Sequence, residues 1–114
     1  MNMHLATFHD DGWELEDGES RHTEAPATFE LPPLTERQSL KAGQIVKLIF
    51  RIALRDEPGL PSERTERMWV SVGEAQGFGY LGTLDNDAYC TPELKAGLQL
   101  SFEPRHVIQI WRES

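Results

Sequence analysis

Gln-Ile-Val-Lys-Leu-Ile-Phe-Arg-Ile-Ala-Leu, residues 44–54, has the strongest strand pattern in the chain. Apolar side chains recur at every second position, and five of them share one face of an extended chain: Val46, Leu48, Phe50, Ile52 and Leu54. An amphipathic helix would instead repeat its apolar positions every three or four residues. Because β-branched and aromatic residues also favour strands, the stretch predicts a long strand with one face in the core.

Shorter apolar runs, separated by turn-forming residues, predict four further strands. They are residues 66–75, 78–84, 98–102 and 106–111. Most of these strands follow one another directly, with little room for helix between them. The predicted class is therefore mainly β, at the margin of α+β: a small curled sheet or SH3-like barrel with one short helix.

The remaining segments are predicted to be helix, hairpin and loop. Residues 34–40 predict the short helix, begun by Thr35 or by the preceding proline pair, with Gly43 close to its end. Residues 5–16 predict a hairpin around Asp11-Gly12, residues 17–28 predict a loop, and residues 91–94 predict one helical turn. A chain of 114 residues is the size of a single domain. We divide it into an acidic N-terminal hairpin or loop segment, 1–26, and a β core, 27–111.

One short pattern occurs twice. Leu40-Lys41-Ala42-Gly43 returns as Leu94-Lys95-Ala96-Gly97, and an apolar strand follows each copy. Glycine permits the reversal that such a turn requires. The pattern predicts two equivalent corners of one small sheet, because repeat proteins need more and longer units.

Charge is concentrated at the N-terminus. Residues 1–30 contain eight acids and one base, Arg21, whereas residues 31–114 contain eleven acids and ten bases, which together make the net charge of −8. Such a segment repels nucleic acid and anionic membranes, so a charged partner is expected to be a basic protein. A merely solubilising acidic face is the other interpretation. Without a signal segment or an apolar run of membrane-spanning length, the expected location is the cytoplasm.

Motifs that resemble catalytic or cofactor sites fail on context. Gly77-Phe78-Gly79-Tyr80-Leu81-Gly82 has the spacing of a dinucleotide loop but lies within a strand pattern instead of opening a helix. Cys90 is the single cysteine, and sequence alone does not bring a histidine to it. The four histidines have no metal-ligand spacing. We therefore expect no cofactor, no metal and no enzymatic activity.

Trp69 is the most informative aromatic residue. It shares a strand face with Arg67 and Ser71, opposite the predicted core face. One interpretation is that Trp69 packs under the N-terminal segment, with Trp13 and Phe29 as partners. The other is that Trp69 marks a contact surface, since Trp and Arg are enriched among the residues that dominate binding energy.

Several segments together resemble a bacterial family of small YegJ-like domains. The resemblance rests on residues 27–32 with 40–50, then 66–70, 80–87 and 94–108, and it extends over residues 27–111. Ala88 and Leu98 stand where the family pattern often has Pro and Asp. The family is similar to immunity proteins of bacterial toxin systems, and the resemblance implies a binding role without catalytic residues.

The leading hypothesis is a non-enzymatic protein-binding module, of which an immunity-type inhibitor of a toxin is one form. Its predicted contact residues are Arg67, Trp69, Tyr80, Asp85, Asn86 and Asp87. The alternative is a small ligand-binding domain or enzyme with a cleft near Tyr80, Asp85 and His106. A third interpretation is an accessory domain without a stable partner.

Overall fold

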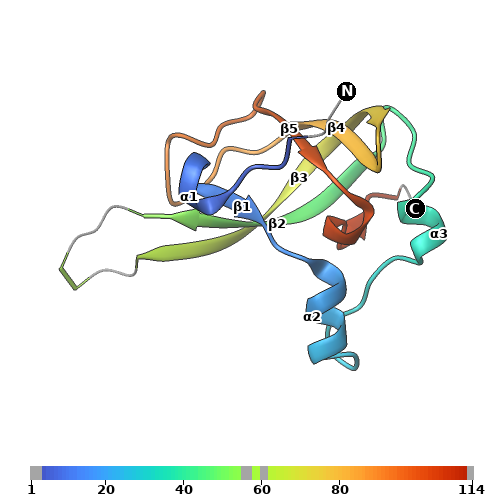
Figure 1. Cartoon of the computed structure of the whole chain (residues 1–114), viewed down its shortest axis with the longest axis horizontal. Coiled ribbons are helices and arrows are strands. Elements are labelled where there is room, and N and C mark those ends of the chain that lie inside the picture. Colours follow the sequence, from blue (N-terminus) through green and yellow to red (C-terminus); the bar gives the residue numbers. More distant parts are fainter. Residues whose placement is uncertain (1–3, 55–57, 60–61, 113–114) are drawn as a thin grey trace.

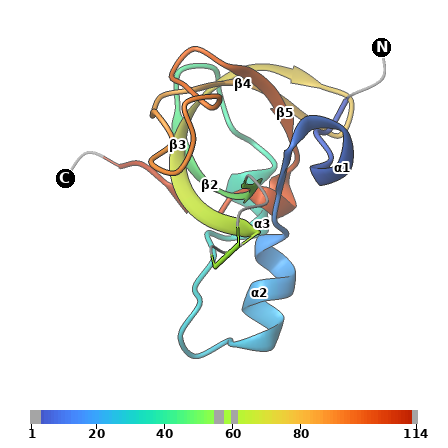
Figure 2. The ribbon, with the colours of Figure 1, turned by 90° about the vertical axis from the view of Figure 1, so that its left-hand side faces the viewer.

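In the computed structural model, which describes residues 4–54, 58–59 and 62–112, the chain is mainly β and forms one antiparallel sheet. The sheet curls into a half-barrel (Figures 1 and 2). Its strand order is β1-β2-β3-β4-β5, and β6 also pairs with β2. The strands are β1 (Trp13–Leu15), β2 (Ile45–Ala53), β3 (Glu63–Gln76), β4 (Gly79–Leu84), β5 (Gln99–Phe102) and β6 (Gln109–Ile110).

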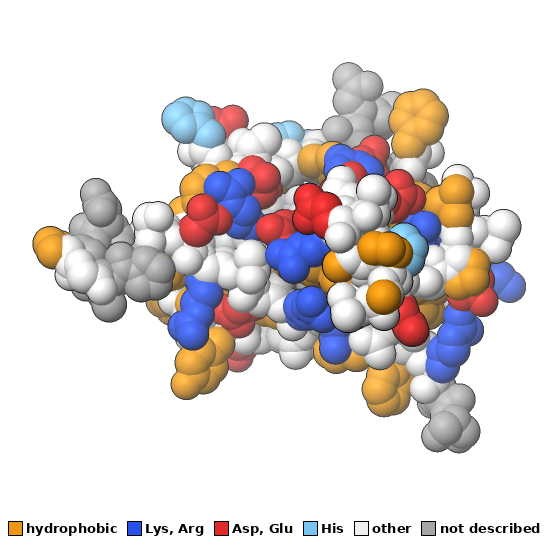
Figure 3. Space-filling view, turned by 90° about the horizontal axis from the view of Figure 1, so that it is seen from below, with side chains coloured by type: hydrophobic (Ala, Val, Ile, Leu, Met, Phe, Trp, Pro, Cys, Tyr) orange, Lys and Arg blue, Asp and Glu red, His pale blue; other side chains and the backbone are white. Residues whose placement is uncertain are grey.

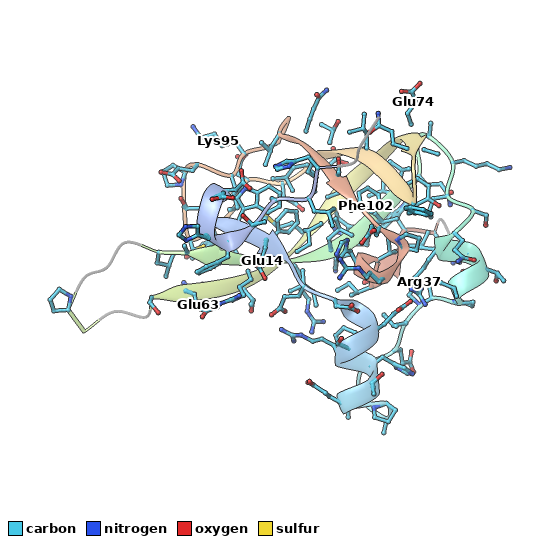
Figure 4. All side chains as sticks on the ribbon, in the orientation of Figure 1. Glu14, Arg37, Glu63, Glu74, Lys95 and Phe102 are labelled. Atoms are coloured by element: carbon cyan, nitrogen blue, oxygen red, sulfur yellow. The ribbon has the colours of Figure 1, made fainter. Side chains whose placement is uncertain are left out.

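The strand predicted from residues 44–54 is confirmed as β2, and it pairs with β3 over its whole length. Alternate residues of both strands face the inside of the half-barrel, so the inward side chains are buried. This inner face holds the core, together with Phe102 of β5 (Figure 4). Seven core residues from β2 and β3 are 4% exposed or less: Val46, Leu48, Phe50, Ile52, Met68, Val70 and Val72.

The hairpin predicted for residues 5–16 is wrong in its first half. Residues Phe8–Asp11 form the short helix α1, which Thr7 caps by accepting the backbone N–H of Asp10 at 3.2 Å. Gly12 then takes a left-handed conformation, with φ of 79°, and ends the helix. The capping threonine, and acids near the positive end of the helix, favour a helical turn over a strand here.

The loop predicted for residues 17–28 is also wrong, because Gly18–Glu24 forms the helix α2. Asp17 caps it by accepting the backbone N–H of Ser20 at 3.0 Å. Gly18 is buried: a Cβ there would lie 2.9 Å from Ile108. α2 thus approaches the sheet on the side away from the core (Figure 2), which propensity alone does not reveal.

Two C-terminal predictions need smaller corrections. Residues 106–111 do not form one strand, because Pro104–His106 is the 3-10 helix η1 and only Gln109–Ile110 pairs as β6. Residues 91–94 contain a turn at 92–93 but no assigned helix. The predicted helix at 34–40 is present as α3, Leu34–Arg37, but is shorter, and the expectation of a single helix is wrong.

The two equivalent corners are confirmed in detail. The N–H of Gly43 donates to the carbonyl of Val72, and the N–H of Gly97 donates to the carbonyl of Leu84, each at 2.8 Å. The φ angles of the two glycines are 95° and 101°. Both leucines that begin the pattern are buried. The repeated sequence therefore makes the same corner at the starts of β2 and β5.

A buried arginine joins the helices to the half-barrel. Arg37 is 5% exposed; its guanidinium donates to the carbonyls of Pro32 and Pro104, at 2.8 and 3.0 Å, and to the carboxylate of Glu19 at 2.8 Å. The hydroxyl of Tyr80 donates to the Arg37 carbonyl at 2.9 Å. One residue thus connects α2, α3, η1 and β4 (Figure 4).

We predict that Arg37→Ala lowers the free energy of unfolding by about 2 kcal/mol or more, because it leaves the carbonyls of Pro32 and Pro104 without the donor that satisfies them. Urea unfolding of the purified chain measures this. Arg112→Ala is the control, since the ion pair of Arg112 with Glu36 is largely exposed and its loss should change stability by less than about 1 kcal/mol. Equal effects of the two substitutions would contradict the role of Arg37.

Gly82 lies where the core leaves no room for a side chain. A Cβ there would lie 2.6 Å from Val70 Cγ1 and 2.9 Å from Phe102 Cε1, inside the core. Gly82→Ala should therefore lower the free energy of unfolding by about 2 kcal/mol through overpacking. The cost should be smaller in a Val70→Ala background, measured by the same unfolding experiment. If the loss of stability in the double variant equals the sum of the two single losses, the clash with Val70 is not the cause.

Candidate functional site

One part of the sheet's outer face, opposite the core, brings two tryptophans together with Lys47 and Arg67. We call this surface the tryptophan face and define it by Lys47, Arg67, Trp69 and Trp111. The rings of Trp69 and Trp111 meet edge to face, with centroids 5.8 Å apart. The ammonium of Lys47 lies 4.5 Å from the centroid of Trp69. Such contacts hold the indoles in place without covering them.

Strand register explains why these residues meet. Lys47 of β2 pairs with Trp69 of β3 on one side and with Gln109 of β6 on the other. Trp111 follows β6, and its N–H donates to the carbonyl of Ile45 at 2.8 Å. Trp69 is half-buried, and Trp111 is 55% exposed. Trp69 therefore packs against the C-terminal segment.

The predicted packing of Trp69 on Trp13 and Phe29 is wrong. Trp13 lies on the other side of β2, where its ring centroid is 5.4 Å from that of Phe50. Phe29 lies beside Arg67 instead, with 5.5 Å between the guanidinium carbon and the ring centroid. The chain after α2 does reach the outer face, but at Arg67 and not at Trp69.

An open groove of about 620 Å³ adjoins the tryptophan face. One wall is the extended chain from Thr28 to Pro33, and the other is formed by β6 and its neighbours. Ile108 and Ile110 are buried and contribute to its lining. Arg67 belongs to both the groove and the tryptophan face, so the two form one continuous surface.

The predicted contact residues Asp85, Asn86 and Asp87 each have a hydrogen-bonding role within the chain. Asn86 accepts the N–H of Trp69 at 2.6 Å, and Asp85 accepts the hydroxyl of Ser71 at 2.6 Å. Asp87 accepts the N–H of Ala96 at 3.0 Å. Asp85 and Asn86 hold the loop after β4 against β3, and Asp87 closes a bond within that loop. Both aspartates remain exposed, so a contact role for them stays a prediction.

Tyr80 does not belong to a contact surface. It is 4% exposed and stacks on Phe102, and its hydroxyl also accepts the N–H of Leu40 at 3.2 Å. His106 is also buried, at 2% exposed. Tyr80 lies near the start of β4, whereas Asp85 follows the end of that strand and is exposed. Among the described residues, the cleft predicted from Tyr80, Asp85 and His106 does not form.

The buried histidine and the cysteine are poorly suited to acid–base or nucleophilic chemistry. Burial, followed by the nearby Arg105 guanidinium, lowers the pKa of His106 to about 4. Its Nδ1 accepts the N–H of Glu103 at 2.9 Å. Burial, followed by a hydrogen bond to the Glu66 carboxylate, raises the pKa of Cys90 to about 11. At neutral pH the imidazole is uncharged and the thiol is protonated, which makes the sulfur a weak nucleophile.

The acidic N-terminal segment is largely engaged within the molecule. Four of its carboxylates form ion pairs, so it is not simply a solvated acidic face. The pairs are Glu14–Arg51, Glu16–Arg21, Asp17–Arg105 and Glu19–Arg37. Figure 3 shows acidic and basic side chains interleaved across the face that carries α2. Three of these pairs tie the segment to the rest of the fold, whereas Glu16–Arg21 lies within the segment itself.

The glycines of the dinucleotide-like pattern lie in a hairpin. Gly77 has a φ of 53° at the turn between β3 and β4, and Gly79 begins β4. The strand β4 follows them directly in place of a helix, so the pattern lacks the geometry that phosphate binding of this type requires. The described residues contain no group of three or more His, Cys, Asp or Glu side chains placed to hold a metal ion.

Sequence reasoning missed three exposed aromatic residues. Phe78 is 91% exposed at the β3–β4 turn, and Tyr89 is 90% exposed in the loop after β4. Trp111 is the third, and it alone joins another aromatic residue outside the core. The sequence shows that Trp111 follows an apolar run. It does not show that β6 pairs with β2 next to Lys47, because the two segments are far apart in the chain.

Comparison of the chain with protein-family models, curated proteins and solved structures finds no match. The resemblance to YegJ-like domains therefore stays a prediction. In the part of the chain that the structure describes, no helix has the length and apolar character needed to cross a membrane.

We predict that stability falls as pH drops from about 6.5 to about 4, because the unfolded chain takes up a proton on His106 that the folded chain does not. Stability rises with pH wherever the unfolded state binds more protons, so this contribution is complete above the ordinary pKa of 6.5. The loss is on the order of 3 kcal/mol. Urea unfolding across this range measures it.

His106→Gln is the matched variant, since its amide oxygen can still accept the N–H of Glu103 but cannot titrate. In this variant the free energy of unfolding should no longer change with pH above about 4.5. Below that value, which is the ordinary pKa of a glutamate, carboxylates such as Glu66 also change the stability. An unchanged slope in His106→Gln would assign the pH dependence to other groups.

Proposed function

We propose that this protein is a non-enzymatic protein-binding module whose contact surface is the tryptophan face. The observation that carries the proposal is the pair of indoles, Trp69 and Trp111, held outside the core next to two cations. Tryptophan and arginine dominate the energy of protein interfaces, where a few anchors supply most of the affinity. The exposed apolar surface of the two indoles is unfavourable in water, and covering it with a partner lowers the free energy.

The state of the other reactive side chains supports binding over catalysis. Tyr80 and His106 are buried in structural hydrogen bonds, and the thiol of Cys90 is held protonated. Neither the groove nor the tryptophan face contains a histidine or a cysteine. Occupying a partner surface requires none of these groups. Inhibition of a toxin by steric occlusion is one form that such binding takes.

Trp111→Ala tests the proposal, because the residue is exposed and its removal should leave the core intact. We expect the variant to bind its partner at least about tenfold more weakly, as for an interface anchor. Tyr89→Ala is the matched control: it removes an exposed aromatic ring in the loop after β4. Circular dichroism checks the fold of both.

The partner is first recovered from native-source lysate with the tagged wild-type chain and identified by mass spectrometry. The purified partner is then titrated with wild type, Trp111→Ala and Tyr89→Ala. Loss of affinity confined to Trp111→Ala supports the proposed surface. Equal affinity for all three chains would move the surface elsewhere, and no recovered partner would count against a binding module.

A further inference from the structure

The groove beside the tryptophan face has the form of a site for an extended chain. Its volume of about 620 Å³ is in the range of sites that enclose small ligands or short peptide segments. Its apolar lining comes from Ile108 and Ile110 of the β6 region and from Phe29 and Leu31 opposite. Such lining suits apolar side chains at alternate positions of a strand.

β6 lines this groove as an edge strand. Among the described residues it pairs with β2 and with no other strand, so its second edge faces away from the sheet. Ile108, Gln109 and Ile110 all line the groove. An exposed edge offers backbone N–H and C=O groups that an added strand can pair with, which is a recurrent mode of peptide recognition.

Charge indicates which chain fits. Arg112 is neutralised by its ion pair with Glu36. Within the described residues, Arg67 has no carboxylate at ion-pair distance, and the same holds for Lys47 next to the groove. Glu30 opposes them with one negative charge. The surface is therefore locally cationic on a protein whose net charge is −8.

We propose that the groove takes an extended acidic segment of the partner protein, added alongside β6, with a carboxylate at Arg67. This inference rests on the proposed function and specifies the partner's chemistry. It differs from the basic partner expected from net charge. Distant charges are screened beyond about 8 Å at physiological salt, so the charges at the contact decide the fit.

A displayed library of random peptides, selected on the full-length purified chain, tests this without knowledge of the partner. We expect the selected peptides to alternate apolar residues and to carry Asp or Glu. Arg67→Glu should weaken their binding at least about tenfold, since it replaces an attraction by a repulsion. Methylation of alternate backbone nitrogens in a selected peptide should also weaken binding, because it removes the donors of an added strand.

Arg64→Glu is the matched control. It makes the same charge change on the same strand, and its position alternates with that of Arg67, so the two side chains face opposite sides of β3. Binding should survive this change. Selected peptides that are basic, that bind Arg67→Glu as well as wild type, or that tolerate backbone methylation would each overturn the proposal, as would a selection that yields none.

The outcomes separate this inference from the proposed function. A partner that depends on Trp111, together with a failed selection for acidic peptides, would leave the binding module standing and remove the acidic segment. Loss of both the partner and the peptides would remove both. If acidic peptides bind and the lysate yields no partner, the groove stands and the tryptophan face loses its support as a protein-binding surface.

Discussion

The tryptophan face and the groove depend on how β2 shares its second edge. One edge of β2 pairs with β3 along nine residues, while the other is divided between β1, at Phe50–Ile52, and β6, at Val46–Lys47. Both terminal segments must therefore meet on one strand. This arrangement brings Trp111 to Trp69 and places β6 beside the chain after α2, which creates the groove.

Polar groups of the kinds that often act in catalysis stabilise this fold instead. Arg37 and Tyr80 join the helices to the half-barrel, and His106 closes the turn at η1. Buried groups of this kind must keep their hydrogen-bond partners, because an unsatisfied polar atom in the interior is costly. In the described residues, no buried side-chain nitrogen or oxygen is left without a partner.

The distribution of charge follows the same logic. The acids at positions 14–19 are paired with arginines, two of them far along the chain at 51 and 105, so much of the N-terminal excess is neutralised locally. Lys47 and Arg67 lie on the opposite face from the core. Net charge therefore describes the long-range field of this protein, whereas its contact surfaces have their own signs.

Local sequence patterns are enough to predict the half-barrel's central strands and its two corners. Alternation of apolar residues identified β2 and the core face of β3, and the repeated Leu-Lys-Ala-Gly identified corners that require a left-handed glycine. These features follow from local backbone geometry, so neighbouring residues suffice to predict them.

For the candidate site, sequence reasoning found Arg67 and Trp69, whose shared strand face is also local. It misassigned Tyr80, because alternation alone does not show which side of a curled sheet is covered. Long-range packing alone shows that Trp111 joins Trp69, that Gly18 of α2 lies against Ile108, and that Glu14 and Asp17 pair with the distant Arg51 and Arg105. Each of these contacts joins residues far apart in the chain, and their pairing depends on packing and closure that no local pattern encodes.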